Sequence, residues 1–139
     1  MTVDGIMEPV TLSVKDDADI VKVRQTGREM ARTLGFGVVD QTRIATALSE
    51  LSRNVMLYAG GGEVTLRRVE SGRRQGIEIV CEDHGPGIDR IDLVMQEGFT
   101  TGRGLGLGLP GAKRLMDDFE VRSEKGRGTR VVTRKWLTR

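Results

Sequence analysis

Apolar residues recur with a helical period in the first half of this chain. Between residues 40 and 58 they fall three and four positions apart, at Ile44, Ala47, Leu48, Leu51, Val55 and Met56. This spacing predicts an amphipathic helix over Asp40–Tyr58. Asp40 is the expected N-cap of that helix, because an aspartate side chain can accept hydrogen bonds from the first turn.

Cap signals predict an earlier helix as well. Asp16 or Asp17 is placed to cap a helix that runs to Leu34, and Gly35 follows as a C-terminal stop. Two short helices are predicted further along, over Ile91–Glu97 and Pro110–Met116.

Alternating apolar and polar residues predict strands over Val10–Val14, Glu63–Val69, Gly76–Asp83, Asp118–Ser123 and Thr129–Trp136. A turn at Ser71–Gln75 joins the second and third of these strands into a hairpin, and a turn at Lys125–Gly128 joins the last two. Trp136 and Leu137 are expected to seal the sheet. The predicted fold class is α+β, with the helices packed on one face of a mixed sheet.

Length and composition fit one ordinary domain covering residues 1–139. The 22 basic and 20 acidic residues leave a net charge of +2, which does not favour nucleic-acid binding, and aromatic residues are only 4%. The lone Cys81 excludes an internal disulfide, fits a reducing compartment and is expected in the core. Because no apolar run approaches ~20 residues and no signal-peptide pattern occurs, we expect a cytoplasmic protein.

A glycine-rich run precedes the Pro110–Met116 helix. Gly102, Gly104, Gly106 and Gly108 alternate with other residues. Glycine leaves backbone N–H groups open to close approach by a phosphate, and the positive end of the following helix favours an anion. The same composition is also compatible with a flexible linker.

Glu50 and Asn54 lie four residues apart on the Asp40–Tyr58 helix, so they share one face. A glutamate can accept a proton from a nucleophile. An asparagine can offer one neutral oxygen to a hard cation such as magnesium that is otherwise held by phosphates and water. Alone, this pair is more typical of a solvated helix surface than of a catalytic site.

Asp83, Gly85 and Gly87 follow the Gly76–Asp83 strand. An aspartate can accept a hydrogen bond from an exocyclic amine such as that of adenine. The two glycines turn the chain tightly and leave space for a flat ring. Alone, this sequence also fits a simple turn.

Together and in this order, these motifs resemble those of the GHKL superfamily of ATPases and kinases, whose fold is a two-layer α/β sandwich of the Bergerat type. The Glu-x-x-x-Asn motif is matched by Glu50 and Asn54, and the Asp-x-Gly-x-Gly motif by Asp83, Gly85 and Gly87. The glycines of the ATP lid are matched by Gly102, Gly104, Gly106 and Gly108, and a final Gly-Thr by Gly128 and Thr129.

Nearly the whole chain resembles the RsbT family of stressosome switch kinases within that superfamily. The matching segments are Thr33–Gln41, Glu50–Val55, Leu57–Gly60 and Leu109–Asp117. The resemblance implies a serine/threonine protein kinase that uses ATP and Mg²⁺, phosphorylates STAS-domain proteins and then activates a phosphatase.

The resemblance also implies a role for each site residue. Adenine is expected near Asp83, Gly85, Gly87 and Thr129, and magnesium at Asn54 and the phosphate oxygens. The lid glycines 102, 104, 106 and 108 are expected to cover the β- and γ-phosphates. Glu50 is expected to take the proton from the acceptor hydroxyl.

The main alternative is a binding module, an anti-sigma factor or nucleotide-gated regulator that works by holding a partner. A fragment of a sensor histidine kinase fits less well, because the only histidine, His84, lies in a predicted strand-end turn rather than on an exposed helix. A dinucleotide-binding domain fits least, because its glycine fingerprint follows a first strand.

Overall fold

The computed structural model describes residues 8–85, 108–124 and 126–138. Within these residues the elements follow the order β1 (Val10–Val14), α1 (Asp17–Leu34), α2 (Val38–Ala59), β2 (Gly62–Ser71), β3 (Arg74–Glu82), α4 (Gly108–Leu115), β4 (Asp118–Glu124) and β5 (Gly128–Trp136). The helix predicted over Ile91–Glu97 and the site residues Gly87, Gly102, Gly104 and Gly106 lie outside the described residues.

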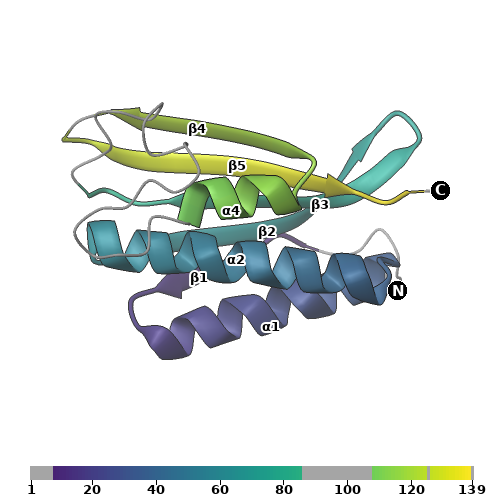
Figure 1. The fold of residues 1–139 in the computed structure, drawn as a ribbon, viewed down its shortest axis with the longest axis horizontal. Helices are drawn as coiled ribbons and strands as arrows, with labels where there is room; N and C mark the ends of the chain where they lie inside the picture. The colour runs from purple at the N-terminus through teal and green to yellow at the C-terminus, as the bar shows by residue number, and fades with distance from the viewer. Residues whose placement is uncertain (1–7, 86–107, 125, 139) are drawn as a thin grey trace.

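The described elements form two layers, with α1, α2 and α4 in one layer and the strands in the other (Figure 1). The sheet has the strand order β1-β2-β3-β5-β4, and each neighbouring pair is antiparallel. The expected α+β class with a helical layer on a sheet is confirmed. The expectation of a mixed sheet is wrong for the described strands, because every neighbouring pair is antiparallel, and β5 lies between β3 and β4, which run in the same direction.

Local signals predicted the ends of α1 correctly. Asp16 caps the helix, since its Oδ1 accepts a hydrogen bond from the Asp19 backbone N–H at 3.0 Å. Gly35 ends it in the left-handed conformation at φ 106°, and its N–H donates to the last turn. Glycine adopts this conformation without the steric cost that other residues carry.

The N-terminus of α2 differs from the prediction. Asp40 is not the N-cap: the helix begins at Val38 after Gly37, which supplies no side-chain cap. The Asp40 carboxylate instead lies 3.0 Å from Arg43 Nη1 and 3.8 Å from Lys135 Nζ. These cations hold Asp40 inside the first turn, where a negative charge is still favourable to the helix dipole.

Several other helix and strand boundaries differ by a few residues from the predicted ones. The β2–β3 hairpin extends further than expected and closes around Gly72, at φ 62°, and Arg73. Helix α4 begins at Gly108 rather than at Pro110. Pro110 still lies in the first turn, where its missing N–H removes no intrahelical hydrogen bond.

The core lies between the helices and one face of the sheet. Its largest fully buried side chains include Ile44, Leu48 and Leu51 of α2, Leu66 of β2, and Ile77 and Ile79 of β3. Helices α1 and α2 approach closely at Gly27, where an added Cβ would lie 2.0 Å from Leu48 Cδ1. Of the helices in the described part of the chain, none is long and apolar enough to span a membrane.

Two predicted packing roles are confirmed. Trp136 is 7% exposed, lies against Gly76 and donates from Nε1 to Asp118 at 2.9 Å, while Leu137 packs against the core. Cys81 is a buried core residue, and burial, together with the negative charges of Asp83 and Glu82, raises its thiol pKa to about 12. The thiol is therefore protonated at neutral pH, as a structural cysteine is.

Candidate functional site

The turn after β3 is tied to the start of β5 through Asp83. The Asp83 backbone N–H donates to the Thr129 carbonyl at 3.0 Å. Its side-chain Oδ1 accepts from the backbone N–H groups of Gly85 at 2.9 Å and Thr129 at 3.2 Å. Three predicted site residues, Asp83, Gly85 and Thr129, thus meet in one hydrogen-bonded cluster, which we call the Asp83 turn.

Close backbone contacts fix the Asp83 turn from both sides. Gly128 has φ 114°, and a Cβ at this position would lie 2.1 Å from the Asp83 carbonyl oxygen. A Cβ at Gly85 would lie 2.6 Å from the Cβ of Ala59, at the end of α2. Only glycine fits at either place without a shift of its neighbours. The glycines therefore hold the end of α2, the Asp83 turn and the start of β5 together.

One carboxylate oxygen of Asp83 has no hydrogen-bond donor in the described part of the chain. Among the described residues, the hydrogen bonds to its side chain all go to Oδ1. The side chain is partly exposed. Oδ2, which no described residue engages, could therefore accept a hydrogen bond from a ligand amine while Oδ1 holds the turn.

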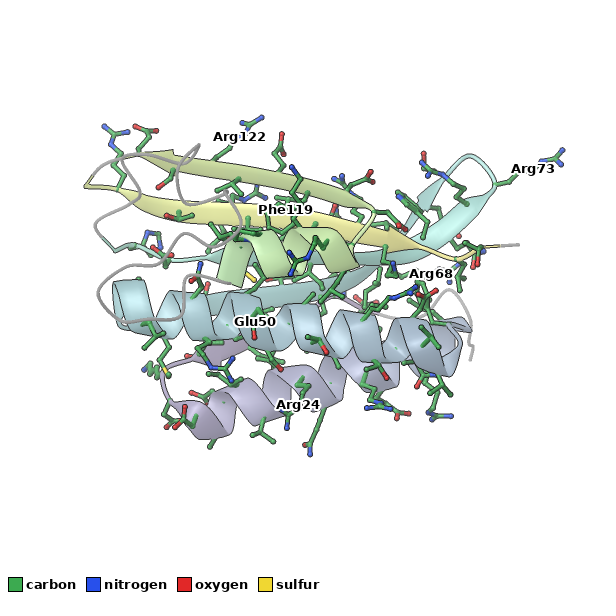
Figure 2. The ribbon with its side chains drawn as sticks, in the orientation of Figure 1. Arg24, Glu50, Arg68, Arg73, Phe119 and Arg122 are labelled. Carbon is green, nitrogen blue, oxygen red and sulfur yellow. The ribbon has the colours of Figure 1, made fainter. Side chains whose placement is uncertain are left out.

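The second part of the site lies on α2. Glu50 and Asn54 share one partly buried face of the helix, as their spacing predicts. Figure 2 shows Glu50 midway along α2, the helix that packs against α4. The Glu50 Oε1 lies 3.3 Å from Arg53 Nη1, and the side chains are 30% and 39% exposed. Within the described residues, the Asn54 amide makes no hydrogen bond.

Gly62 connects the two parts of the site. A Cβ at Gly62 would lie 2.8 Å from Val55 Cγ1 on α2 and 3.1 Å from Asp83 Cβ. Val55 directly follows Asn54, so the Asn54 turn of α2 packs beside the Asp83 turn. The residues of two separate sequence motifs are thereby brought into one neighbourhood.

Gly108 lies at the start of α4, which packs on α2. Leu109 and Ala112 are buried, at 4% and 0% exposure, and fix this end of α4 in the core. The end of the glycine-rich run is therefore anchored beside the helix that carries Glu50 and Asn54. A phosphate at this end would also meet the positive pole of α4.

The residues present fit a magnesium ion shared with a nucleotide. In the described part of the chain, no group of three or more His, Cys, Asp or Glu side chains is placed to hold a metal. Magnesium commonly uses one or two protein oxygens together with phosphates and water. Asn54, whose amide has no hydrogen-bond partner among the described residues, could supply one such oxygen, and Glu50 lies one turn away.

A hollow of about 540 Å³ near the strand ends is a separate feature. It is lined by Ser13, Lys15, Ala59, Gly60, Gly61, Gly62, Glu63, Glu82 and His84. None of the predicted site residues lines it. His84 is exposed in the turn after β3, where the sequence predicts it, and not on a helix.

Sequence reasoning missed the part that three residues play in the site. Gly128 was read only as part of a motif, although its contact with the Asp83 carbonyl fixes the turn. Arg53 was not singled out, although it pairs with Glu50. The signal for Arg53 was present in the sequence, because an acid followed by an arginine three residues later on a helix predicts an ion pair. Ser123 also joins the cluster, through a hydrogen bond of 2.8 Å between its hydroxyl and that of Thr129.

Comparison with known proteins agrees with this geometry. The model of the histidine kinase-, DNA gyrase B- and HSP90-like ATPases matches residues 39–139. The serine/threonine-protein kinase RsbT of Bacillus subtilis (strain 168) is 54% identical over 119 residues, which are 86% of this chain and 90% of that protein. An anti-sigma F factor of Clostridium kluyveri is 31% identical over 98 residues, covering 68% of this chain and 69% of that protein.

A solved structure shows the same fold. The catalytic domain of the histidine kinase ThkA aligns with a TM-score of 0.53 and 18% sequence identity, covering 93% of this chain and 95% of that one. At this identity the likeness concerns the fold. It supports the two-layer arrangement expected from the motifs.

Proposed function

Because the chain belongs to the histidine kinase-, DNA gyrase B- and HSP90-like ATPases, as a serine/threonine kinase of the RsbT type, we propose that it phosphorylates STAS-domain regulatory proteins with ATP. The observation that carries the proposal is the state of Asp83. One of its oxygens holds the turn, and the other accepts no hydrogen bond from the described residues. The helix packed beside this turn presents a carboxylate and an amide.

The Asp83 turn accounts for nucleotide recognition in this proposal. Asp83 Oδ2 accepts a hydrogen bond from the adenine amine, and Gly85 and Gly87 leave room for the ring. Thr129 holds Asp83 in place through its backbone N–H. Gly102, Gly104, Gly106 and Gly108 cover the β- and γ-phosphates with backbone N–H groups.

The α2 residues carry out the transfer. Glu50 takes the proton of the acceptor hydroxyl as that oxygen attacks the γ-phosphorus, and the bond between this phosphorus and the bridging oxygen breaks, so that ADP leaves. Asn54 offers an amide oxygen to magnesium, which neutralises phosphate charge when it is bound. The protein mainly positions groups and stabilises charge.

The pathway around this reaction is part of the proposal. After phosphorylating its STAS partner, the kinase leaves that protein and activates a phosphatase in a bacterial stress response of the stressosome type. ATP as the donor fits the cytoplasmic location that the sequence predicts. The support is the 54% identity to RsbT, which spans 90% of that kinase.

A transfer assay with γ-labelled ATP, magnesium and a purified STAS-domain protein tests the proposal. The wild-type chain should label the partner, and Glu50→Gln should do so ~10²–10⁴-fold more slowly because the general base is lost. Nucleotide affinity should be unchanged. Glu63→Gln, at an exposed position outside the predicted site, is the matched control. Near-normal transfer by Glu50→Gln would remove Glu50 from the mechanism.

Partner sequestration is a second candidate function, favoured by the relatives named anti-sigma F factor. In this case the chain would hold a partner without transferring phosphate, or do both. A chain that forms an ATP-dependent complex with a partner but leaves it unlabelled would support sequestration over catalysis. Labelled partner released from the complex would support the kinase.

A further inference from the structure

We propose that Arg53 is a positioning residue that sets the carboxylate of Glu50 for phosphotransfer. The inference rests on the proposed function, because it assigns a role to Arg53 in that same reaction. Its basis is the contact of 3.3 Å between Arg53 Nη1 and Glu50 Oε1 on the partly buried face of α2. Arg53 stands directly before Asn54, so the ion pair lies within the predicted site.

A glutamate on a helix surface needs a restraint to act as a base. Its side chain has several rotatable bonds, and the carboxylate must come within hydrogen-bond reach of the acceptor hydroxyl. A misplacement of ~1 Å at a reacting group can cost ~10²-fold in rate. Within the described residues, Arg53 is the group that pairs with Glu50. It therefore decides which way the carboxylate points.

The geometry of the pair suits this role. Arg53 engages Oε1 alone, so no described residue occupies Oε2, the oxygen that would receive the proton. The two side chains are 39% and 30% exposed, and exposed ion pairs of this spacing contribute little to stability. Loss of the arginine should therefore affect the rate much more than the fold.

Helix α2 contains a matched ion pair away from the site. Arg43 Nη1 lies 3.0 Å from Asp40 Oδ1, with the same order and the same three-residue spacing. Asp40 also lies near Lys135, and the pair stands at the N-terminal end of the helix. Arg43→Met removes a comparable charge and a comparable contact without touching Glu50.

The experiment is a double-mutant cycle in the transfer assay, with a STAS-domain protein and ATP as substrates. Arg53→Met should lower kcat ~10-fold and leave the KM and Kd for ATP within ~2-fold, because only the base is displaced. Arg53→Lys should restore part of the rate, since it keeps the charge but not the planar fork. In the Glu50→Gln background, Arg53→Met should cause no further loss. Arg43→Met should behave as wild type, and all variants should unfold within ~2 °C of it.

The results that would contradict the positioning role differ from those that would contradict the proposed function. Full activity of Arg53→Met, or an equal loss in the Glu50→Gln background, would overturn the positioning role. A weakened ATP affinity would overturn it too, because Arg53 would then contact the nucleotide rather than Glu50. An absence of transfer by the wild-type chain, or full activity of Glu50→Gln, would instead contradict the proposed function itself.

Discussion

Glu78 lies on strand β3 and Asp83 lies just beyond its end, and their two carboxylates differ in how the surrounding residues engage them. Glu78 is 3% exposed, and both of its oxygens are engaged, by Arg67 Nε at 2.6 Å and by Arg134 Nε at 2.8 Å. The Asp83 side chain is partly exposed, and its hydrogen bonds from described residues come from backbone N–H groups and reach Oδ1 alone.

The difference separates a structural carboxylate, Glu78, from the carboxylate that we propose binds the nucleotide, Asp83. A buried carboxylate with both oxygens paired to arginines has nothing left to offer, and its loss should be felt by the fold. A carboxylate held by backbone donors through one oxygen keeps its position and presents the other. Because backbone donors do not depend on neighbouring side chains, the Asp83 turn is organised before any nucleotide arrives.

The largest expected effect comes from filling the space at Gly128. Gly128→Ala would place a Cβ 2.1 Å from the Asp83 carbonyl oxygen, at a φ of 114° that alanine rarely adopts. Strain and overpacking together should cost about 3 kcal/mol or more of unfolding free energy. Nucleotide binding should be lost as well, since the turn must move. Urea unfolding and nucleotide titration measure the two effects.

Gly126→Ala is the matched control for this change. Gly126 lies in the same β4–β5 turn at φ 81°, and no atom lies within 4 Å of a Cβ there. It should cost only about 1–2 kcal/mol for the left-handed backbone and leave nucleotide affinity unchanged. Equal effects of the two substitutions would show that the contact with Asp83 has no special importance.

The next largest effect should come from the structural carboxylate. Glu78→Gln should lower the free energy of unfolding by about 2 kcal/mol at pH 7, because it removes a buried charge partner from Arg67 and Arg134. Nucleotide affinity should not change. Glu120→Gln, which breaks an exposed pair with Arg122 at 3.5 Å, should cost less than about 0.5 kcal/mol. A loss of nucleotide binding in Glu78→Gln would erase the contrast with Asp83.

The pKa of Glu78 predicts the direction in which this stability difference changes with pH. Burial alone would raise the pKa of Glu78, but hydrogen bonds from Arg67 and Arg134, with their charges, outweigh it and lower the pKa below the ordinary 4.5. The folded chain thus binds fewer protons than the unfolded chain in this range. The stability from Glu78 is present above pH 4.5 and is lost as the pH falls through the folded-state pKa. The difference in the free energy of unfolding between wild type and Glu78→Gln should therefore disappear at acid pH.

Asp83→Asn should affect the ligand rather than the fold. The asparagine oxygen can still accept the N–H groups of Gly85 and Thr129, but its amide nitrogen replaces the free oxygen. A hydrogen bond to a charged group is worth roughly 1.5–3 kcal/mol, so nucleotide affinity should fall ~10-fold or more with little change in far-UV dichroism. Asp83→Ala should lose stability as well. Unchanged affinity in Asp83→Asn would leave Asp83 as a turn residue only.

Local chemistry explains which parts of the fold were predictable. Asp16 and Gly35 act within their own turns, so the ends of α1 follow from the sequence nearby. Asp40 is bound by Lys135 from the last strand, and no local pattern contains that partner. The position of β5 between β3 and β4 is likewise a long-range pairing, which alternation within each strand does not specify.

The candidate site, like the fold, was predictable where the signal is local and not where it depends on long-range contacts. The motifs identified Glu50, Asn54 and Asp83 because their residue types and spacing carry chemistry, and the structure brings their segments together. The hydrogen bond from the Thr129 N–H to Asp83 joins residues far apart in the chain, so the sequence could name both residues but not their contact. The Glu50–Arg53 pair was readable from spacing alone.

The smallest expected effect concerns Asn54, which completes the contrast between engaged and available oxygens. Asn54→Asp replaces a neutral oxygen with a charged one, and ligand charge raises the affinity of a site for a divalent cation. The magnesium concentration for half-maximal transfer at fixed ATP should therefore fall ~3-fold, while the added carboxylate beside Glu50 slows the reaction. Thr46→Asp, at an exposed position one turn before Glu50, adds the same charge without offering a ligand at position 54. Equal magnesium profiles for the two variants would mean that charge alone acts and that Asn54 is not a ligand.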